Sequence, residues 1–342
     1  MDYKLYDYLE DIEARLDLDK ELEIEAFWED WKEYRAGMTH APAPRPASEP
    51  GLKWPDININ DALEDDEAMI LSEFRRVSDI LKKSTIHPLR VRCNYGVGNV
   101  ATAFGAQKFI MPRETNSLPN VVKLGQKGCA ALLEKPLPDR LAGNFKDIFR
   151  VAEKFNAIRA KYPKIGRFVR IEQPDLQGPM DNIELLYGSE YFYDLYDEPE
   201  LIHALLAKMT EFISFIMDEW LKVVPGGTAS YFRHIEKGAL VIRDDSAMNL
   251  SPDMFDEFIA PYDGKLLKKY GGIVHFCGRG DHFIDRLARL EGLRGINMSQ
   301  PHLNEMEKVL SCTVDKGLHL SLSSPWNEYG AHNRDNLLLL PY

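Results

Sequence analysis

The chain has 342 residues, of which 44% are hydrophobic and 28% charged, which is the profile of a globular protein able to bury a large core. Its 42 basic and 54 acidic residues give a formal net charge of −12, which argues against nucleic acid or an anionic membrane surface as a partner, because both need a positive face. A membrane span needs about 18 consecutive apolar residues, and no stretch of the sequence approaches this length. The first residues are acidic, which is unlike a signal peptide. The four widely spaced cysteines then predict reduced thiols and a cytoplasmic protein.

The first 85 residues are predicted to form a helical N-terminal extension. Apolar residues recur at helical spacing over residues 3–38 and again over about 61–83. The proline-rich stretch 41–55 between them is a linker or extended arm, since proline cannot continue a helix. Two placements are open for this extension: it packs on its own domain, or it crosses to a neighbouring subunit in a homodimer.

Residues 86–342 are predicted to form a second domain in which strands and helices alternate. Eight strands followed by helices favour an α/β fold of the (β/α)8 TIM barrel type, with a doubly wound open sheet as the competitor. Asp181, Asp197 and Ser251 have the spacing of helix N-caps. The predicted strands are 88–93, 121–124, 166–172, 229–232, 239–243, 273–277, 295–298 and 318–322, and the predicted helices are 139–161, 181–187, 198–222, 252–270, 280–290 and 303–314.

In a barrel of this kind the chemistry lies just after the C-terminal ends of the strands. Polar residues at these positions are candidates for substrate binding, and they are Asn94, Tyr95, Gln173, Gln177 and Asn297.

Three carboxylates at strand ends are candidate catalytic residues: Glu172 and the adjacent pair Asp244 and Asp245. Neighbouring carboxylates repel each other unless a cation, a hydrogen-bond donor or water offsets the repulsion. Two interpretations of the pair are open, namely solvated or capping side chains, and a group that holds a metal or orients a substrate.

The clearest chemical signal is His275-Phe-Cys277 at the end of the sixth predicted strand. Residues i and i+2 of a strand face the same side, so His275 and Cys277 point together, and both are zinc ligands by type. Gly278 and Gly280 then let the chain turn closely past a ligand. The pair alone is also compatible with a buried histidine beside a neutral cysteine.

A zinc site needs at least three protein ligands. Cys312 fits by type, but it falls in the predicted outer helix 303–314 and is expected to be a buried residue that binds no metal. The remaining candidates for the third ligand are Asp244, Asp245, Glu172 and His332.

The run DDSAMNLSPDMFDEFIAPYDGKLLKKYGGIVHFCGRGDHFIDRL, residues 244–287, resembles the uroporphyrinogen decarboxylase superfamily. Its Asp-Asp, Ser-Pro, Pro-Tyr and His-x-Cys-Gly motifs follow in the order found there, and Gln177-Gly-Pro-Met-Asp181 and Asn94-Tyr-Gly96 fit as well. The likeness covers roughly residues 88–340. It implies a barrel and either of two activities, porphyrinogen decarboxylation or zinc-dependent methyl transfer with a corrinoid protein.

Two departures from that pattern bear on the activity. The arginine-bearing segment with which the decarboxylases hold the carboxylates of their substrate is missing, so the chain resembles the methyltransferases more closely. The methyltransferases carry a further cysteine after the eighth strand, where this chain has Ser323 and Ser324.

Three functions are therefore open. The first is methyl transfer between a corrinoid, supplied by a partner protein, and a thiol bound to Zn²⁺, with His275 and Cys277 as ligands. The second is metal-free decarboxylation of a porphyrinogen or another polycarboxylate, with Asp244 facing a protonated pyrrole and with positive charge from Arg92, Arg170, Arg233 or Arg243. The third is a non-catalytic protein that binds a tetrapyrrole or a corrinoid.

Overall fold

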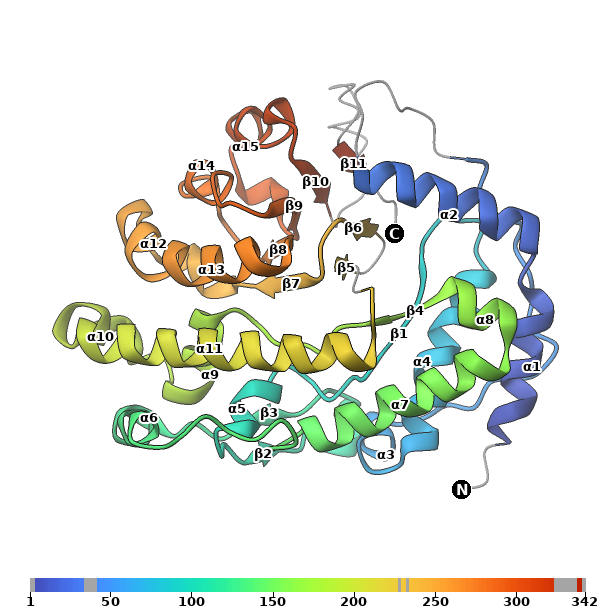
Figure 1. Cartoon of the computed structure of the whole chain (residues 1–342), viewed down its shortest axis with the longest axis horizontal. Coiled ribbons are helices and arrows are strands. Elements are labelled where there is room, and N and C mark those ends of the chain that lie inside the picture. Colours follow the sequence, from blue (N-terminus) through green and yellow to red (C-terminus); the bar gives the residue numbers. More distant parts are fainter. Residues whose placement is uncertain (1–3, 34–41, 227–228, 232–233, 323–336, 340–342) are drawn as a thin grey trace.

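The computed structural model describes residues 4–33, 42–226, 229–231, 234–322 and 337–339. Strands lie in the middle of the molecule and helices surround them (Figure 1). The mixed α/β class is therefore confirmed. In the described part of the chain, no helix combines the length and apolar character needed to cross a membrane.

The N-terminal region forms four helices where the apolar spacing predicted two. Aspartates cause both breaks: the carboxylate of Asp17 accepts the backbone N–H of Lys20, and that of Asp65 accepts the N–H groups of Glu67 and Ala68. The helices are α1 (Leu5–Arg15), α2 (Leu18–Glu33), α3 (Ile59–Glu64) and α4 (Asp66–Leu81).

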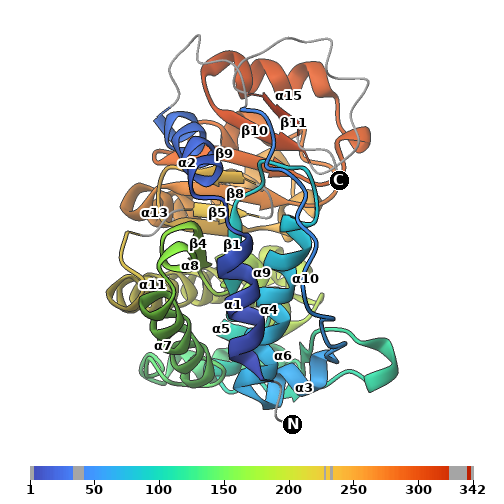
Figure 2. The ribbon, with the colours of Figure 1, turned by 90° about the vertical axis from the view of Figure 1, so that its right-hand side faces the viewer.

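Helices α1 and α4 lie side by side along one flank of the molecule (Figure 2). Their buried residues, such as Leu9, Ile12 and Phe74, belong to the same hydrophobic core as the later helices. Helix α2 contacts β6 and α8 instead, and its Trp31 ring packs on His319. Helix α2 thus packs on the C-terminal part of its own chain, whereas α1 packs on α8, and α4 packs on β1 and α7.

Eleven further α-helices follow in the described part of the chain, and several differ from the predicted boundaries. Pro261 splits the predicted helix 252–270 at Ile259, because proline has no N–H to continue the first helix. They are α5 (Asn99–Ala103), α6 (Gly125–Leu133), α7 (Phe145–Lys161), α8 (Pro163–Phe168), α9 (Pro179–Tyr187), α10 (Tyr191–Asp197), α11 (Pro199–Val223), α12 (Pro252–Phe258), α13 (Ala260–Tyr270), α14 (Ile284–Leu287) and α15 (Met306–Cys312).

Three N-caps were predicted, and one is confirmed. The Ser251 hydroxyl accepts the N–H of Met254 at the start of α12. Asp197 instead ends α10, and Glu198 precedes α11 without a side-chain cap. Asp181 lies inside the first turn of α9, which begins at Pro179. The prediction was wrong at these two positions because prolines set the helix starts: Pro179 starts α9 earlier than predicted, and Pro199 starts α11 one residue later.

The described strands pair in four groups. A parallel sheet has the order β11-β10-β9-β8-β7, β1 pairs in parallel with β4, and β2–β3 and β5–β6 are antiparallel pairs. Strand β5 contacts both β4 and β7, which places the groups next to one another. The strands are β1 (Leu89–Arg92), β2 (Lys108–Phe109), β3 (Asn120–Val121), β4 (Val169–Glu172), β5 (Ala229–Tyr231), β6 (His234–Glu236), β7 (Leu240–Arg243), β8 (Gly272–Phe276), β9 (Leu293–Met298), β10 (His319–Leu322) and β11 (Leu337–Leu339). Hydrogen-bonded pairing among these strands does not by itself close an eight-stranded barrel.

One predicted strand is half helix. Residues 166–168 of the predicted strand 166–172 belong to α8, because Pro163 starts a helical turn and Gly166 lets that turn approach α7. A Cβ on Gly166 would lie 2.2 Å from the carbonyl oxygen of Arg159. The strand β4 then begins at Val169.

The C-terminal ends of three strands meet around one carboxylate. Arg92 ends β1, Arg243 ends β7, and both pair with Asp175, which follows β4 by three residues. This edge, where β1, β4 and β7 end together, is the place where the fold predicts functional residues.

Candidate metal centre

Strand β8 presents His275 toward the interior of the fold. Val274 and Phe276 belong to the large hydrophobic core, whereas Ile273 packs on Val241 in a separate small cluster. Because side chains alternate along a strand, His275 shares the face of Ile273, and Cys277 follows on the same side.

Asp245, His275 and Cys277 form a compact group of potential metal ligands. One ligand atom from each lies within 4.8 Å of the other two. The Cys277 Sγ is 3.5 Å and the Asp245 Oδ1 is 3.8 Å from the Nε2 of His275. Asp245 Oδ1 also accepts the backbone N–H of Cys277 at 2.7 Å. A nitrogen, a sulfur and an oxygen donor thus converge on one point.

The other ring nitrogen of His275 is held by Asn297. The Nδ1 lies 2.6 Å from the amide oxygen of Asn297, so the Nδ1–H donates and the Nε2 keeps its lone pair. Burial lowers the pKa of His275, which favours the neutral imidazole. A neutral imidazole whose Nε2 lone pair is directed at two other potential ligands is the form that binds a metal.

Burial, followed by the Asp245 carboxylate, raises the pKa of the Cys277 thiol. Cys277 is therefore a thiol unless a cation is bound, since a metal-bound thiol loses its proton. The side chain of Asp245 is 48% exposed, so the group opens to solvent on this side. The donor set N, S and O fits Zn²⁺, which would be held by three protein ligands with one position open.

A short 3₁₀ turn, η2 (Asp245–Asn249), sets the direction of Asp245. The two oxygens of Asp181 accept the N–H groups of Asp245 and Ser246 at 2.9 and 2.8 Å. Burial raises the pKa of Asp181 to about 7. Asp181 thus anchors the turn that carries Asp245.

Asp244 points away from the group of three. It is buried, and its carboxyl hydrogen-bonds to Asp263 of α13. Burial and the nearby carboxylates raise the pKa of Asp244 well above its usual range, and burial raises that of Asp263 to about 8. Asp244 is therefore protonated at neutral pH and is not available as a ligand in this arrangement.

The loop after β8 is fixed by glycine and by amide side chains. Gly278 has φ +78°, and a Cβ there would lie 2.5 Å from the Met248 side chain. The space above Gly278, which was expected to face a ligand, is filled by Met248. Gln300 and Asn304 accept the N–H groups of Gly278 and Gly280.

Glu172, a candidate for catalysis and for the metal, lies outside the group of three. It forms an ion pair with Arg90 across the β1–β4 pair. The chain reaches this arrangement because both residues face the interior from neighbouring strands. The spacing of Arg90 and Glu172 in the sequence does not predict this contact.

The candidate substrate-binding residues are also distributed over several places. The amide of Gln173 bonds to both the N–H and the carbonyl of Val241 and so bridges β4 to β7. Gln177, at φ +54°, donates to Asp175. Asn94 accepts from Arg92.

Tyr95 and Cys312 lie away from the site. Tyr95 is 2% exposed in the main hydrophobic core, and burial raises the pKa of its phenol. Cys312 is half-buried near the end of α15 and packs on that core from outside. His332, Ser323 and Ser324 lie outside the described residues.

Three residues near the group were missed as site residues. Asp181 was interpreted as a helix cap, and Asp263 and Ser321 carry no motif. Ser321 is hydrogen-bonded to Asn297 from the neighbouring strand β10. The alternation of His319 and Ser321 along a buried strand was the one signal that could have pointed to it.

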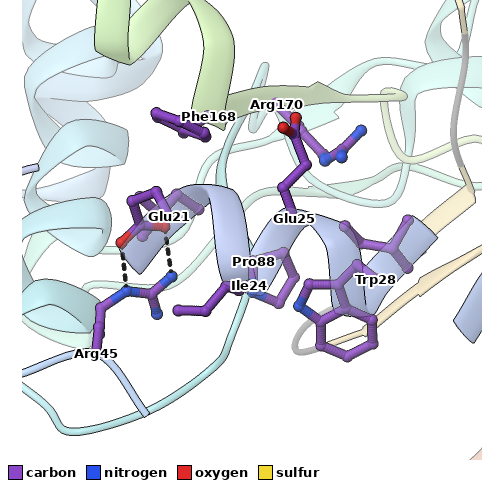
Figure 3. A pocket seen from close by; sticks show the side chains of 10 residues that line it. Glu21, Ile24, Glu25, Trp28, Arg45, Pro88, Phe168 and Arg170 are labelled. Carbon is purple, nitrogen blue, oxygen red and sulfur yellow. Dashed lines mark hydrogen bonds and ion pairs between the residues drawn. The ribbon is translucent and has the colours of Figure 1, made fainter. Parts of the chain in front are cut away.

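A pocket at the opposite strand ends is separate from this group (Figure 3). It is lined by α2 and by the starts of β1 and β4, including Trp28, Leu89 and Phe168. The buried Arg45 pairs with Glu21 through two bonds of 2.8 and 2.9 Å at its edge. This ion pair fastens the proline-rich arm to α2.

The family model described as uroporphyrinogen decarboxylase (URO-D) matches residues 176–310. No curated protein matches the chain. The matched range contains Asp245, His275, Cys277 and Asn297, and it confirms the family resemblance that these motifs carry.

Proposed function

On the premise that residues 176–310 belong to the uroporphyrinogen decarboxylase superfamily, we propose that the chain is a zinc-dependent methyltransferase that moves a methyl group between a corrinoid and a thiol. The observation that carries this proposal is the convergence of Asp245, His275 and Cys277 within 4.8 Å. Asp245 takes the place of the cysteine that the methyltransferases carry after their last strand.

The chemistry of the group supports zinc. When bound, Zn²⁺ would supply positive charge that holds an acceptor thiol as its thiolate at neutral pH. His275 would offer Nε2, because Asn297 occupies its Nδ1–H. Cys277 and Asp245 would offer sulfur and oxygen, and a bound cation would offset the repulsion from the Asp245 carboxylate that otherwise keeps Cys277 protonated.

The residues around the group would position the reactants. Asp181 holds the η2 turn, so the exposed side of Asp245 faces the solvent from which a thiol enters. The corrinoid would be presented by a separate protein. We extend the proposal to the fold: β1, β4, β5 and β7 to β11 form the wall of a (β/α)8 barrel, with β5 bridging β4 and β7.

Metal-free decarboxylation of a polycarboxylate is the second candidate. It is favoured by Arg92 and Arg243, two cations that meet around Asp175 at the same strand ends. However, the role expected for Asp244 needs an ionised carboxylate. Its burial and its hydrogen bond to Asp263 keep Asp244 protonated, which favours the methyltransferase.

The test is demethylation of methylcobalamin by a set of small thiols, in the presence of protein loaded with one equivalent of zinc. The proposal predicts loss of the methyl–cobalt absorbance and formation of a methyl thioether with the wild type. Cys277→Ser should be inactive, and Cys129→Ser, which alters a buried cysteine of α6, should be active.

Turnover of a porphyrinogen without metal, with no thiol methylation, would contradict the proposal and support the decarboxylase. Binding of methylcobalamin without turnover of either substrate would instead support a protein that only binds the corrinoid.

A further inference from the structure

A chain of hydrogen bonds leads from His275 across three strands. His275 on β8 contacts Asn297 on β9, and the Asn297 amide nitrogen donates to the hydroxyl of Ser321 on β10 at 2.7 Å. The Ser321 hydroxyl lies 3.3 Å from the Nε2 of His234 on β6. All four side chains are buried, so water does not replace these bonds.

The direction of each hydrogen bond depends on the next one. With the Asn297 oxygen toward His275, its NH₂ faces Ser321, and the Ser321 hydroxyl then donates to His234. In this arrangement the Nε2 of both histidines carries a lone pair.

The reverse arrangement satisfies the same side-chain bonds and loses only the longer bond, 3.4 Å, from the Asn297 amide nitrogen to the backbone carbonyl of Ser321. If Asn297 turned its amide over, its NH₂ would donate to the Nδ1 of His275, whose proton would then reside on Nε2. Ser321 would donate to Asn297 and accept from a protonated Nε2 of His234. A His275 with a hydrogen on Nε2 has no lone pair directed at Cys277 and Asp245, so this arrangement binds no metal.

We propose that Ser321 and His234 are positioning residues that hold His275 in the tautomer with an unprotonated Nε2, so residues on β10 and β6 set the metal-binding state of the site. This proposal depends on the proposed function in one respect only, namely that the tautomer serves to bind zinc. Burial lowers the pKa of His234 to about 3, so His234 is neutral at physiological pH and can accept the hydrogen bond.

The first test measures the tautomer in metal-free protein. Two-bond ¹H–¹⁵N correlation spectra of protein labelled with ¹⁵N-histidine distinguish a protonated Nδ1 from a protonated Nε2, and His275→Gln assigns the signals. We expect His275 to be protonated on Nδ1 in the wild type. In Ser321→Ala and in His234→Phe, a substantial fraction should carry the proton on Nε2.

The second test measures zinc affinity by competition with a chelator. Ser321→Ala should weaken zinc binding about 10-fold, the lower end of the effect of losing an outer partner of a metal-binding histidine. Ser321→Thr keeps the hydroxyl and should restore both the tautomer and the affinity. Thr210→Val removes a buried hydroxyl in α11, bonded only to Leu206 among the described contacts, and should change neither quantity.

A wild-type His275 protonated on Nε2 would overturn the proposal. So would a Ser321→Ala variant with an unchanged tautomer, whatever its thermal stability. Failure of the wild type to bind zinc would overturn the proposed function and not the coupling, because the spectra are recorded without metal.

Discussion

Asp244 and Asp245 are consecutive in the chain, but their side chains lie in opposite environments. Asp244 is buried against Asp263, whereas Asp245 is half exposed and lies 3.8 Å from His275. Asp181 causes the separation. Its carboxylate accepts the N–H of Asp245 and so holds the η2 turn, which begins directly after β7. One carboxyl of the pair is therefore suited to a cation and the other is not.

Gln173 bonds to β7, which is the edge strand of its sheet among the described strands. Its amide satisfies both backbone groups of Val241, so Gln173→Leu leaves two buried polar groups without partners. We expect a loss of about 2–4 kcal/mol in the free energy of unfolding, measured by urea denaturation. The exposed Gln126→Leu should change it by less than about 0.5 kcal/mol. Equal effects of the two substitutions would show that the bridge contributes nothing.

Trp31 attaches helix α2 to β6 through Glu236. Its indole N–H donates to the buried carboxylate of Glu236 at 2.9 Å, while that of Trp28 donates to a backbone carbonyl. Trp31→Phe should cost about 1–3 kcal/mol, because a buried charged acceptor loses a donor, and Trp28→Phe about 1 kcal/mol. Thermal melts of both variants provide the comparison. A larger loss in Trp28→Phe would contradict this role for Trp31.

His234 should make the protein sensitive to acid. Burial lowers its pKa in the native state to about 3, whereas the unfolded chain binds the proton near pH 6.5. The unfolded state therefore holds more protons between these values, and this histidine's contribution to stability falls as the pH is lowered from 6.5 toward 3. The unfolding free energy of the wild type relative to His234→Gln should decrease over this range in urea titrations. Parallel pH profiles of the two proteins would contradict the buried, neutral state.

Strand alternation was sufficient to predict that His275 and Cys277 face the same side. It could not select Asp245 over Asp244 or Glu172, because that choice depends on Asp181 and on Arg90, which lie far away in sequence. The helices of the N-terminal region were predicted by apolar spacing, but their breaks depend on aspartate caps.

The surroundings of Tyr95 and Asn297 could not be predicted from the sequence either, because they depend on residues far away in the chain. Tyr95 follows a strand end, as a ligand-binding residue would, and yet its loop turns the ring into the core. Asn297 was predicted to bind substrate, whereas the structure places it against His275.

Cys312 is predicted to be irrelevant to the metal. It lies near the end of α15 and outside the group of three, so Cys312→Ala should leave the zinc content unchanged. Elemental analysis of the purified variant, expressed without added metal or chelator, measures this. Loss of zinc would contradict this and show that Cys312 contributes to the metal site.

The central claim is that Asp245, His275 and Cys277 hold one zinc ion. Calorimetric titration of zinc into metal-free protein tests it most directly, with Cys277→Ser and Cys312→Ala titrated in parallel and thermal melts confirming that each is folded. The account predicts one equivalent bound at micromolar or lower concentration by the wild type and by Cys312→Ala, and none by Cys277→Ser. A wild type that binds no zinc at these concentrations, or a Cys277→Ser that binds it equally well, would contradict the account.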